Sequence, residues 1–230
     1  MQEKRLVIAI DGPAASGKST TARKVAEKLG YLYVDTGAMY RAVTLEVLRQ
    51  GADPDDEVAI ERILRSVRIE LKPAETGLCV LLNNEDVTKD IRSAEVTRNV
   101  SAVSRIRAVR KYLVRMQRKF GKHGGVVLEG RDIGTVVFPR ADLKVYMVAD
   151  LGARSKRRAE EMRALGMKVE EERLAEEIHK RDLLDSTRAE SPLVKPEGSV
   201  EIDTSSLTIE AQVDLVVKKA KELLKENRKR

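Results

Sequence analysis

One motif near the start of the chain constrains the fold more than any other feature. Residues 8–30 read IAIDGPAASGKSTTARKVAEKLG, in which Gly12, Gly17, Lys18 and Ser19 match the spacing G-x-x-x-x-G-K-S. An apolar run precedes the motif, and a segment with apolar residues at helical spacing follows it. A strand, a glycine-rich turn and a helix in this order form the setting in which such a loop wraps a phosphate group. The segment therefore predicts a P-loop in an α/β fold.

The chemistry of this loop indicates a nucleoside triphosphate. Glycines let the backbone aim several N–H groups at phosphate oxygens, and the helix N-terminus adds partial positive charge. We expect Lys18 to reach the β- and γ-phosphates of ATP and the hydroxyl of Ser19 to bind Mg²⁺. A glycine-rich turn that matches by chance is the competing interpretation, which the flanking elements disfavour. The candidate ATP-binding residues are Gly12, Pro13, Ala14, Ala15, Ser16, Gly17, Lys18, Ser19 and Thr20.

Apolar runs and helical patterns alternate along the rest of the chain. Because helical patterns separate the strands, we expect a parallel sheet in a three-layer α/β P-loop fold. The five expected strands cover residues 5–10, 31–34, 124–130, 142–149 and 198–203.

Two segments interrupt this alternation. Residues 51–90 predict a polar helix and then a small antiparallel hairpin with its turn around residues 72–77. Residues 153–185 predict charged helix. A C-terminal helix is expected over residues 209–224. We expect four of its residues to lie on or near one face, which packs on the core: Ala211, Leu215, Val216 and Leu223.

Composition limits the class of protein. A chain of 230 residues suits one α/β core with inserts. The single cysteine, Cys79, cannot form an internal disulfide, and no apolar stretch approaches membrane-spanning length. We therefore expect a soluble cytoplasmic protein with no membrane partner. The net charge of +7 favours a polyanionic partner, either nucleotide phosphate or nucleic acid, although a heavily solvated surface would give the same excess.

The positive charge is concentrated in one block. Residues 96–128 contain nine basic side chains and no acidic one. An apolar helical stripe runs from Ile106 to Phe120, with Arg110 at its edge and most other basic side chains on the solvent side. A solvated face is the simplest interpretation, and an RNA-binding ATPase is the alternative from another class. Aromatic residues make up only 3% of the chain, which disfavours base stacking. We expect no nucleic-acid partner.

Polar motifs follow the expected strands. DTGAMYR follows the second strand and LEGRDIGTVVFP follows the third, where ligand-binding loops of parallel sheets lie. We expect Glu129 to bind Mg²⁺ or its water shell, and Arg131 and Asp132 to face the crevice. For DTGAMYR, the alternative is a helix N-cap at residues 35–36 with Arg41 in solvent. For LEGRDIGTVVFP, the alternative is an Arg131–Asp132 pair on the surface.

A third polar motif, KRDLLDSTR, places Arg181, Asp185 and Arg188 at i, i+4 and i+7, on one face if the segment is helical. A ladder of surface ion pairs is the alternative.

Five stretches together resemble the bacterial cytidylate kinases, members of the nucleoside monophosphate kinase group: IDGPAASGKST, DTGAMYR, EGRDIGTVVFP, KRDLLDSTR and SPLVKPEG with IDTSSLT. The resemblance covers nearly the whole chain. It implies transfer of the γ-phosphoryl group of Mg-ATP to CMP or dCMP by a monomer. It also implies a core of residues 1–35, 97–152 and 171–230, an NMP-binding insert of residues 36–96 with the small sheet, and a short helical lid of residues 153–170.

The resemblance also implies roles for individual residues. The implied catalytic residues are Lys18, Arg131, Arg154 and Arg158. Ser19 would bind Mg²⁺, with Glu129 acting through water. CMP would be bound by Thr36, Tyr40, Arg41, Ser101, Arg110, Arg131, Asp132, Arg181, Asp185 and Arg188.

The cytosine edge would be read by Ser101, Arg110 and Asp132. A carboxylate accepts from the N4 amino group of cytosine, whereas uracil would present O4 to it. Kinases of UMP, dTMP or shikimate are the alternatives among enzymes.

Overall fold

The computed structural model describes residues 5–74, 77–164, 166 and 169–228. The chain divides into two compact units. Unit 1 consists of residues 1–32 and 123–230, and unit 2 consists of residues 33–122.

Unit 1 is built on a five-stranded parallel sheet in the order β2-β6-β1-β7-β8. The central strand β1 pairs in parallel with β6 and β7, and β7 pairs in parallel with β8. The chain passes into unit 2 within β2. All five expected strands and the parallel sheet are confirmed. The strands are β1 (Val7–Asp11), β2 (Leu32–Asp35), β6 (Val126–Gly130), β7 (Leu143–Val148) and β8 (Val200–Asp203).

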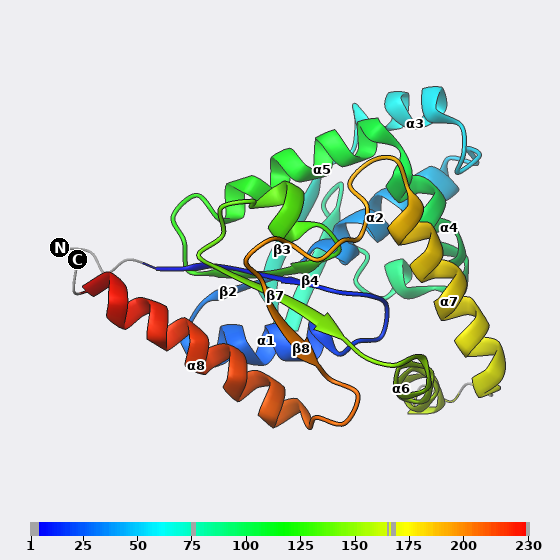
Figure 1. Cartoon of the computed structure of the whole chain (residues 1–230). Helices are drawn as coiled ribbons and strands as arrows, with labels where there is room; N and C mark the ends of the chain where they lie inside the picture. The colour runs from blue at the N-terminus through cyan, green and yellow to red at the C-terminus, as the bar shows by residue number, and fades with distance from the viewer. Residues whose placement is uncertain (1–4, 75–76, 165, 167–168, 229–230) are drawn as a thin grey trace. The chain divides into compact units, whose positions relative to one another are not determined.

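Two helices cover one face of this sheet. Helix α1 (Lys18–Leu29) packs on β6, and α8 (Ile209–Arg228) packs on both α1 and β7, so that the two helices lie side by side in Figure 1. Helix α8 buries Val213, Val216 and Ala220, whereas Leu215 is 44% exposed. The prediction that placed Leu215 on or near the packed face is therefore wrong, because the buried stripe runs through positions 213, 216, 217 and 220.

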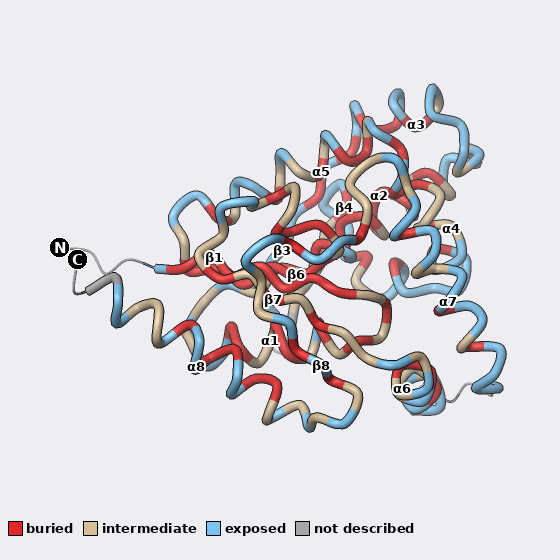
Figure 2. Tube along the Cα trace, in the orientation of Figure 1, coloured by how far each residue is buried: buried red, intermediate tan, exposed pale blue. Residues whose placement is uncertain are grey.

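The charged segment forms two helices that pack on each other, α6 (Leu151–Ala164) and α7 (Glu171–Thr187). Helix α7 is mostly exposed, in contrast to the central strands β1 and β6, whose residues are almost all buried (Figure 2). Its buried positions are Leu174, Ile178 and Asp185. Two apolar contacts thus anchor the helix, and a carboxylate is buried near its C-terminal end. The expected lid, residues 153–170, includes residues 165 and 167–168, which lie outside the described residues.

Unit 2 has its own apolar core, which includes Met39, Ile60, Leu82 and Leu113. The helices around this core are α2 (Thr36–Arg49), α3 (Glu57–Leu64), α4 (Ala94–Arg105) and α5 (Arg107–Phe120). A short 3₁₀ turn, η1 (Asp90–Arg92), precedes α4. Unit 2 continues to residue 122, beyond the expected insert of residues 36–96.

The antiparallel sheet of unit 2 confirms the expected hairpin. Its strands are β3 (Ile69–Ala74), β4 (Gly77–Leu82) and β5 (Glu85–Asp86). Lys72 pairs with Cys79 and Ala74 pairs with Gly77, so the two strands extend further into the predicted turn region, residues 72–77, than expected. Residues 75–76, between the strands, lie outside the described residues.

Candidate active site

The P-loop joins the end of the central strand β1 to α1. Gly12 and Gly17 have φ values of +154° and +87°, in the region that favours glycine. A Cβ atom at Gly12 would lie 2.2 Å from the carbonyl oxygen of Met147 in β7. The loop can follow this path only if position 12 lacks a side chain.

Lys18 lies inside the loop that it completes. Its Nζ donates to the carbonyl oxygen of Pro13 at 2.6 Å and lies 3.4 Å from Oγ of Ser16. Burial of the side chain, with repulsion from Arg131, lowers the pKa of Lys18 to about 7. An anion bound in the loop would restore the ammonium form.

The loop after β6 lies next to the P-loop because β6 and β1 are neighbours, with Asp11 opposite Gly130. The buried carboxylate of Asp11 accepts hydrogen bonds from the backbone N–H groups of Ile133 at 2.8 Å and Gly134 at 2.7 Å. Burial raises the pKa of Asp11 to about 6, although both backbone bonds oppose the shift. These bonds begin a π-helical turn, η2 (Ile133–Val137), and fix the segment that carries Arg131 and Asp132.

Four of the predicted residues form one buried cluster. Nε of Arg131 donates to Asp185 at 2.9 Å, and Arg188 lies 3.7 Å from Asp185 and 3.9 Å from Asp132. Burial alone would raise the pKa of Asp185, but Arg131, Arg181 and Arg188 outweigh it and hold the pKa below its usual value. The alternative of surface pairs is wrong, since the side chains of Asp185 and Arg188 are 7% and 5% exposed.

The predicted helical face is correct for two of its three members. Arg181 and Asp185 lie in α7, but Arg188 is the residue after the helix and has extended backbone angles. Its Nε instead donates to the carbonyl oxygen of Ser191 at 2.7 Å. Arg188 therefore reaches Asp185 from the loop that follows α7.

Arg181 has unused hydrogen-bonding capacity. Its Nε is buried and has no hydrogen-bond partner among the described residues. Burial, followed by repulsion from Arg131, lowers the pKa of Arg181 to about 10. Because buried donors are rarely left unpaired, this nitrogen marks a position where an anionic ligand would be stabilised.

The two predicted arginines of α6 lie in different environments. Arg154 is buried, and its guanidinium contacts the carbonyl oxygens of Ala149 at 3.0 Å and Ala14 at 3.3 Å. Arg158 is partly exposed and pairs with Glu161 at 3.0 Å. Only Arg154 is held against the P-loop.

In unit 2, two of the predicted arginines, Arg110 and Arg41, each contact other residues of that unit. The buried guanidinium of Arg110 lies over the ring of Tyr40, 5.3 Å from its centroid, and donates to the carbonyl oxygen of Ser104 at 2.9 Å. Arg41 donates to Oγ1 of Thr97 at 2.9 Å, so the alternative that left Arg41 in solvent is wrong.

The helix N-cap that the same alternative placed at residues 35–36 is confirmed at the N-terminus of α2. Asp35 is the N-cap of α2, and its side chain accepts from the backbone N–H of Ala38 at 2.9 Å. Thr36, the first residue of the helix, is buried, and Ser101 of α4 is partly buried.

Comparison with known proteins identifies the family. The model of the family described as cytidylate kinase matches residues 8–222. A protein named cytidylate kinase from Anoxybacillus flavithermus is 50% identical over 94% of this chain and 96% of its own length. One with the same name from Bacillus subtilis is 48% identical over the same shares of the two chains. The chain belongs to the cytidylate kinase family.

Solved structures support the fold of this cytidylate kinase family member. A gluconokinase from Sinorhizobium meliloti matches it with a TM-score of 0.51 at 13% identity, over 99% of this chain and 98% of the other. At that identity the likeness concerns the fold alone. No helix in the described part of the chain is both long enough and apolar enough to span a bilayer.

The residues of this family member fit Mg²⁺, which prefers oxygen ligands and keeps several waters. Ser19 is exposed at the start of α1. Glu129 is buried at the end of β6, opposite Ile10 of β1. Within the described residues, no group of three or more His, Cys, Asp or Glu side chains forms a complete metal cage. A serine hydroxyl and a carboxylate are oxygen donors of the kind that Mg²⁺ prefers.

Three polar residues that support the candidate site were not predicted from the sequence. Thr97 accepts from Arg41, Asp11 fixes the loop after β6, and Asp182 contacts both Ala14 and Arg154. Asp11 precedes the P-loop and Asp182 follows Arg181, so adjacency to motif residues was the only available signal.

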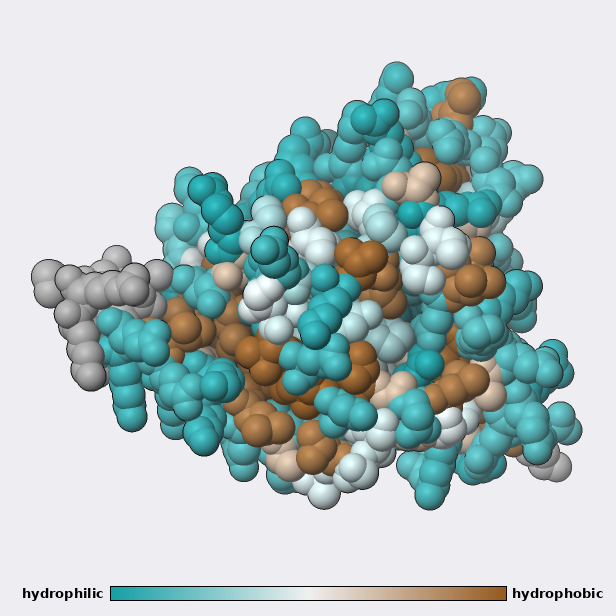
Figure 3. All heavy atoms as spheres, viewed as in Figure 1, coloured by the Kyte–Doolittle hydropathy of each residue, from teal (hydrophilic) through white to brown (hydrophobic). Residues whose placement is uncertain are grey.

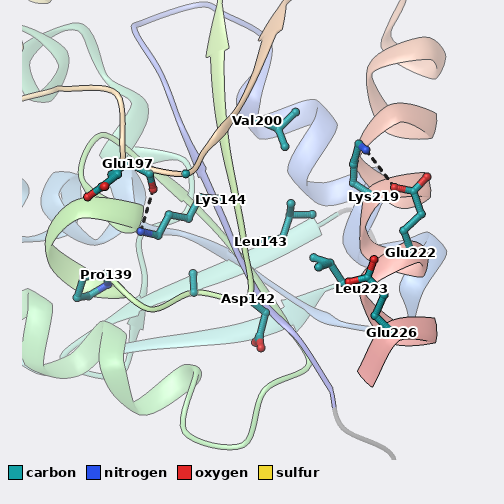
Figure 4. A pocket seen from close by; sticks show the side chains of 12 residues that line it. Pro139, Asp142, Leu143, Lys144, Glu197, Val200, Lys219, Glu222, Leu223 and Glu226 are labelled. Carbon is teal, nitrogen blue, oxygen red and sulfur yellow. Dashed lines mark hydrogen bonds and ion pairs between the residues drawn. The ribbon is translucent and has the colours of Figure 1, made fainter. Parts of the chain in front are cut away.

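A cavity of about 470 Å³ lies at the opposite end of the sheet from the P-loop (Figure 4). Leu143, Val200 and Leu223 provide apolar lining, and Lys144, Lys219 and Glu222 lie around them. In Figure 3, hydrophobic side chains gather over the part of unit 1 where β7, β8 and α8 lie. None of the predicted site residues lines this cavity.

Proposed function

We propose that this chain transfers the γ-phosphoryl group of Mg-ATP to CMP and dCMP, giving ADP with CDP or dCDP. The observation that carries the proposal is the buried cluster at the carboxyl end of the parallel sheet. There Arg131, Asp185 and Arg188 lie together, and Nε of Arg181 has no hydrogen-bond partner within the part of the chain that the structure describes. Such a set of arginines suits the phosphate of a nucleotide. Family membership supports the same substrates.

The donor would be bound by the P-loop, residues 12–20. Lys18 would turn from the carbonyl oxygen of Pro13 to the phosphates. Ser19 would hold Mg²⁺, with Glu129 acting through water, and the ion supplies positive charge to the phosphate oxygens. Arg154 already lies against the loop. Arg158 would first have to leave Glu161, which costs little because exposed ion pairs are weak.

The acceptor would be bound by the residues that the likeness to the cytidylate kinases implies. Arg131, Arg181 and Arg188 would bind phosphate or ribose oxygens, with Asp185 accepting from the sugar. Arg41 and Thr36 of unit 2 would also bind the phosphate.

Asp132, Ser101 and Arg110 would read the cytosine edge. A buried carboxylate accepts from the N4 amino group, but it would face the O4 acceptor of uracil. An unpaired buried acceptor discriminates more strongly than a difference in size.

Catalysis would consist of positioning and charge neutralisation. The attacking oxygen is a CMP phosphate oxygen, which is ionised at neutral pH, so no side chain has to act as a base. Lys18, Arg131, Arg154 and Arg158 would stabilise the negative charge of the transferring group. The division into a core of residues 1–35, 97–152 and 171–230, an insert of residues 36–96 and a lid of residues 153–170 belongs to this proposal, as does a monomeric enzyme without a nucleic-acid partner.

The test is ADP release from Mg-ATP with CMP, dCMP, UMP, AMP, dTMP or no acceptor. We expect turnover with CMP and dCMP well above that with UMP. The variant Asp132→Asn is expected to lower the ratio of kcat/KM for CMP over UMP by roughly 10- to 100-fold. Asp214→Asn, at an exposed pair with Lys28, is the matched control.

Three outcomes would contradict parts of the proposal. Strong turnover of UMP by the unmodified chain would keep the kinase and reject the role of Asp132. An unchanged ratio in Asp132→Asn would do the same. ADP release without any acceptor would indicate an ATPase, whose binding to RNA would then be measured at several salt concentrations.

A further inference from the structure

Asp182 is a partly buried carboxylate on α7 that touches two other parts of unit 1. One oxygen, Oδ1, accepts from the backbone N–H of Ala14 in the P-loop at 3.2 Å. The other, Oδ2, pairs with Nη1 of Arg154 on α6. The side chain of Asp182 is 19% exposed and that of Arg154 is 10% exposed. One carboxylate thus connects α7, α6 and the phosphate-binding loop.

The guanidinium of Arg154 is held at three points. Nε donates to the carbonyl oxygen of Ala149, and Nη1 contacts both the carbonyl oxygen of Ala14 and the carboxylate of Asp182. The two backbone groups of Ala14 are therefore both used, its N–H by Asp182 and its carbonyl oxygen by Arg154. A free arginine side chain samples many rotamers, so this arrangement removes entropy before any ligand binds.

Asp185, the other carboxylate that α7 contributes to the site, has different partners. Asp185, three residues further along, pairs with Arg131 and Arg188. The charge of Asp182 nevertheless reaches that cluster, because it favours the charged forms of Arg131 and Arg181. The two carboxylates therefore divide the arginines between them, and Asp182 alone pairs with Arg154 among the described contacts.

We propose that Asp182 is a positioning residue that holds Arg154 against the P-loop, with the guanidinium already oriented for the transferring phosphoryl group. The inference rests on the proposed function for the reaction in which Arg154 acts. Asp182 itself does not touch the reacting atoms. Its contribution depends on the presence of Arg154.

The test is a double-mutant cycle with Asp182→Asn and Arg154→Met. An asparagine has one acceptor oxygen and no charge, so it cannot satisfy both Ala14 and Arg154. Because a hydrogen bond to a charged group is stronger than one between neutral groups, we expect Asp182→Asn to lower kcat by at least about tenfold. In the Arg154→Met background, the same change is expected to lower kcat by less than about twofold.

Two further variants separate this role from a structural one. Asp182→Glu keeps the charge and the pair with Arg154, so we expect it to retain most of kcat. Glu177→Gln removes a carboxylate from an exposed pair on the same helix and is expected to behave like the unmodified chain. If thermal unfolding shows that Asp182→Asn does not fold, Asp182→Ser replaces it in the cycle. An equal loss in both Arg154 backgrounds would overturn the proposal.

Calorimetric titration with ATP repeats the cycle without an acceptor. We expect Asp182→Asn to weaken ATP binding only when Arg154 is present. Loss of a carboxylate that merely repels phosphate would instead tighten binding in both backgrounds and would overturn the inference. Absence of CMP turnover in the unmodified chain would overturn the proposed function, while the binding cycle would still decide the role of Asp182.

Discussion

At the scale of single residues, Lys18 is poised between two charge states. Its ammonium group is buried and contacts only the carbonyl oxygen of Pro13 and the hydroxyl of Ser16 among the described hydrogen bonds. Burial lowers its pKa to about 7. Above that pH the neutral amine predominates, and bound triphosphate would favour the charged form.

ATP binding is therefore expected to take up a proton. At pH 8 a group with a pKa near 7 is about nine-tenths neutral, so uptake should approach one proton, and at pH 6 it should be small. Calorimetric titrations with Mg-ATP in two buffers of different ionisation enthalpy measure this number. Lys18→Arg keeps a permanent charge and is expected to abolish the uptake at pH 8. Equal uptake in both proteins would assign the proton to another group.

The residues of the P-loop could be predicted because their chemistry depends on local spacing. Asp11 and Asp182 could not, because the partners of Asp11 lie 122 and 123 positions away in the sequence, and those of Asp182 lie 28 and 168 positions away. Only the parallel pairing of β1 with β6 brings Asp11 to the amides of Ile133 and Gly134. A carboxylate next to a motif has no signature of its own until the tertiary fold supplies its partners.

At the scale of secondary structure, the packing of α8 shows how periodicity can mislead. A pattern of apolar residues predicted Leu215 on or near the packed face, yet Val216 is buried and Leu215 is 44% exposed. Gln212 is buried instead, because Oε1 of its amide accepts from Thr21 of α1 and its Nε2 donates to the carbonyl oxygen of Leu207. Because Gln212 is part of the buried face of α8, that face differs from the one that the apolar residues alone predict.

Two alanine substitutions on α8 test this orientation. Val216→Ala removes buried methyl groups and is expected to lower the free energy of unfolding by about 1–3 kcal/mol. Leu215→Ala should change it by less than about 0.5 kcal/mol, although leucine is the larger side chain. Urea unfolding followed by circular dichroism measures both. A larger effect at position 215 would contradict the orientation of α8.

At the scale of the whole molecule, the parallel sheet, the antiparallel insert and the helical segments were all predictable. The alternation of strand and helix patterns required crossovers, and crossovers require a parallel sheet. The extent of unit 2 was not predictable, because the apolar stripe of α5 does not indicate which of the two cores the helix packs on. Leu113 of α5 packs with Met39 and Ile60, so residues as far as 122 belong to unit 2.

Ligand binding provides a test at this scale. ATP at 100 times its Kd is expected to raise the free energy of unfolding by about 2.7 kcal/mol. For a chain of this length, that corresponds to an increase in Tm of about 5–10 °C. Lys18→Met is the control and is expected to lose most of the increase. An undiminished increase in that variant would mean that the nucleotide is bound elsewhere.

The central position of β1 has a consequence for how the chain is made. Val7 pairs with Val126, so β1 has to wait for a partner that is synthesised 119 positions later. At 5–20 residues per second, this delay is roughly 6–24 s. Unit 2 is continuous in sequence and is complete before that partner emerges. During synthesis, unit 2 can therefore fold before the parallel sheet that carries the P-loop is complete.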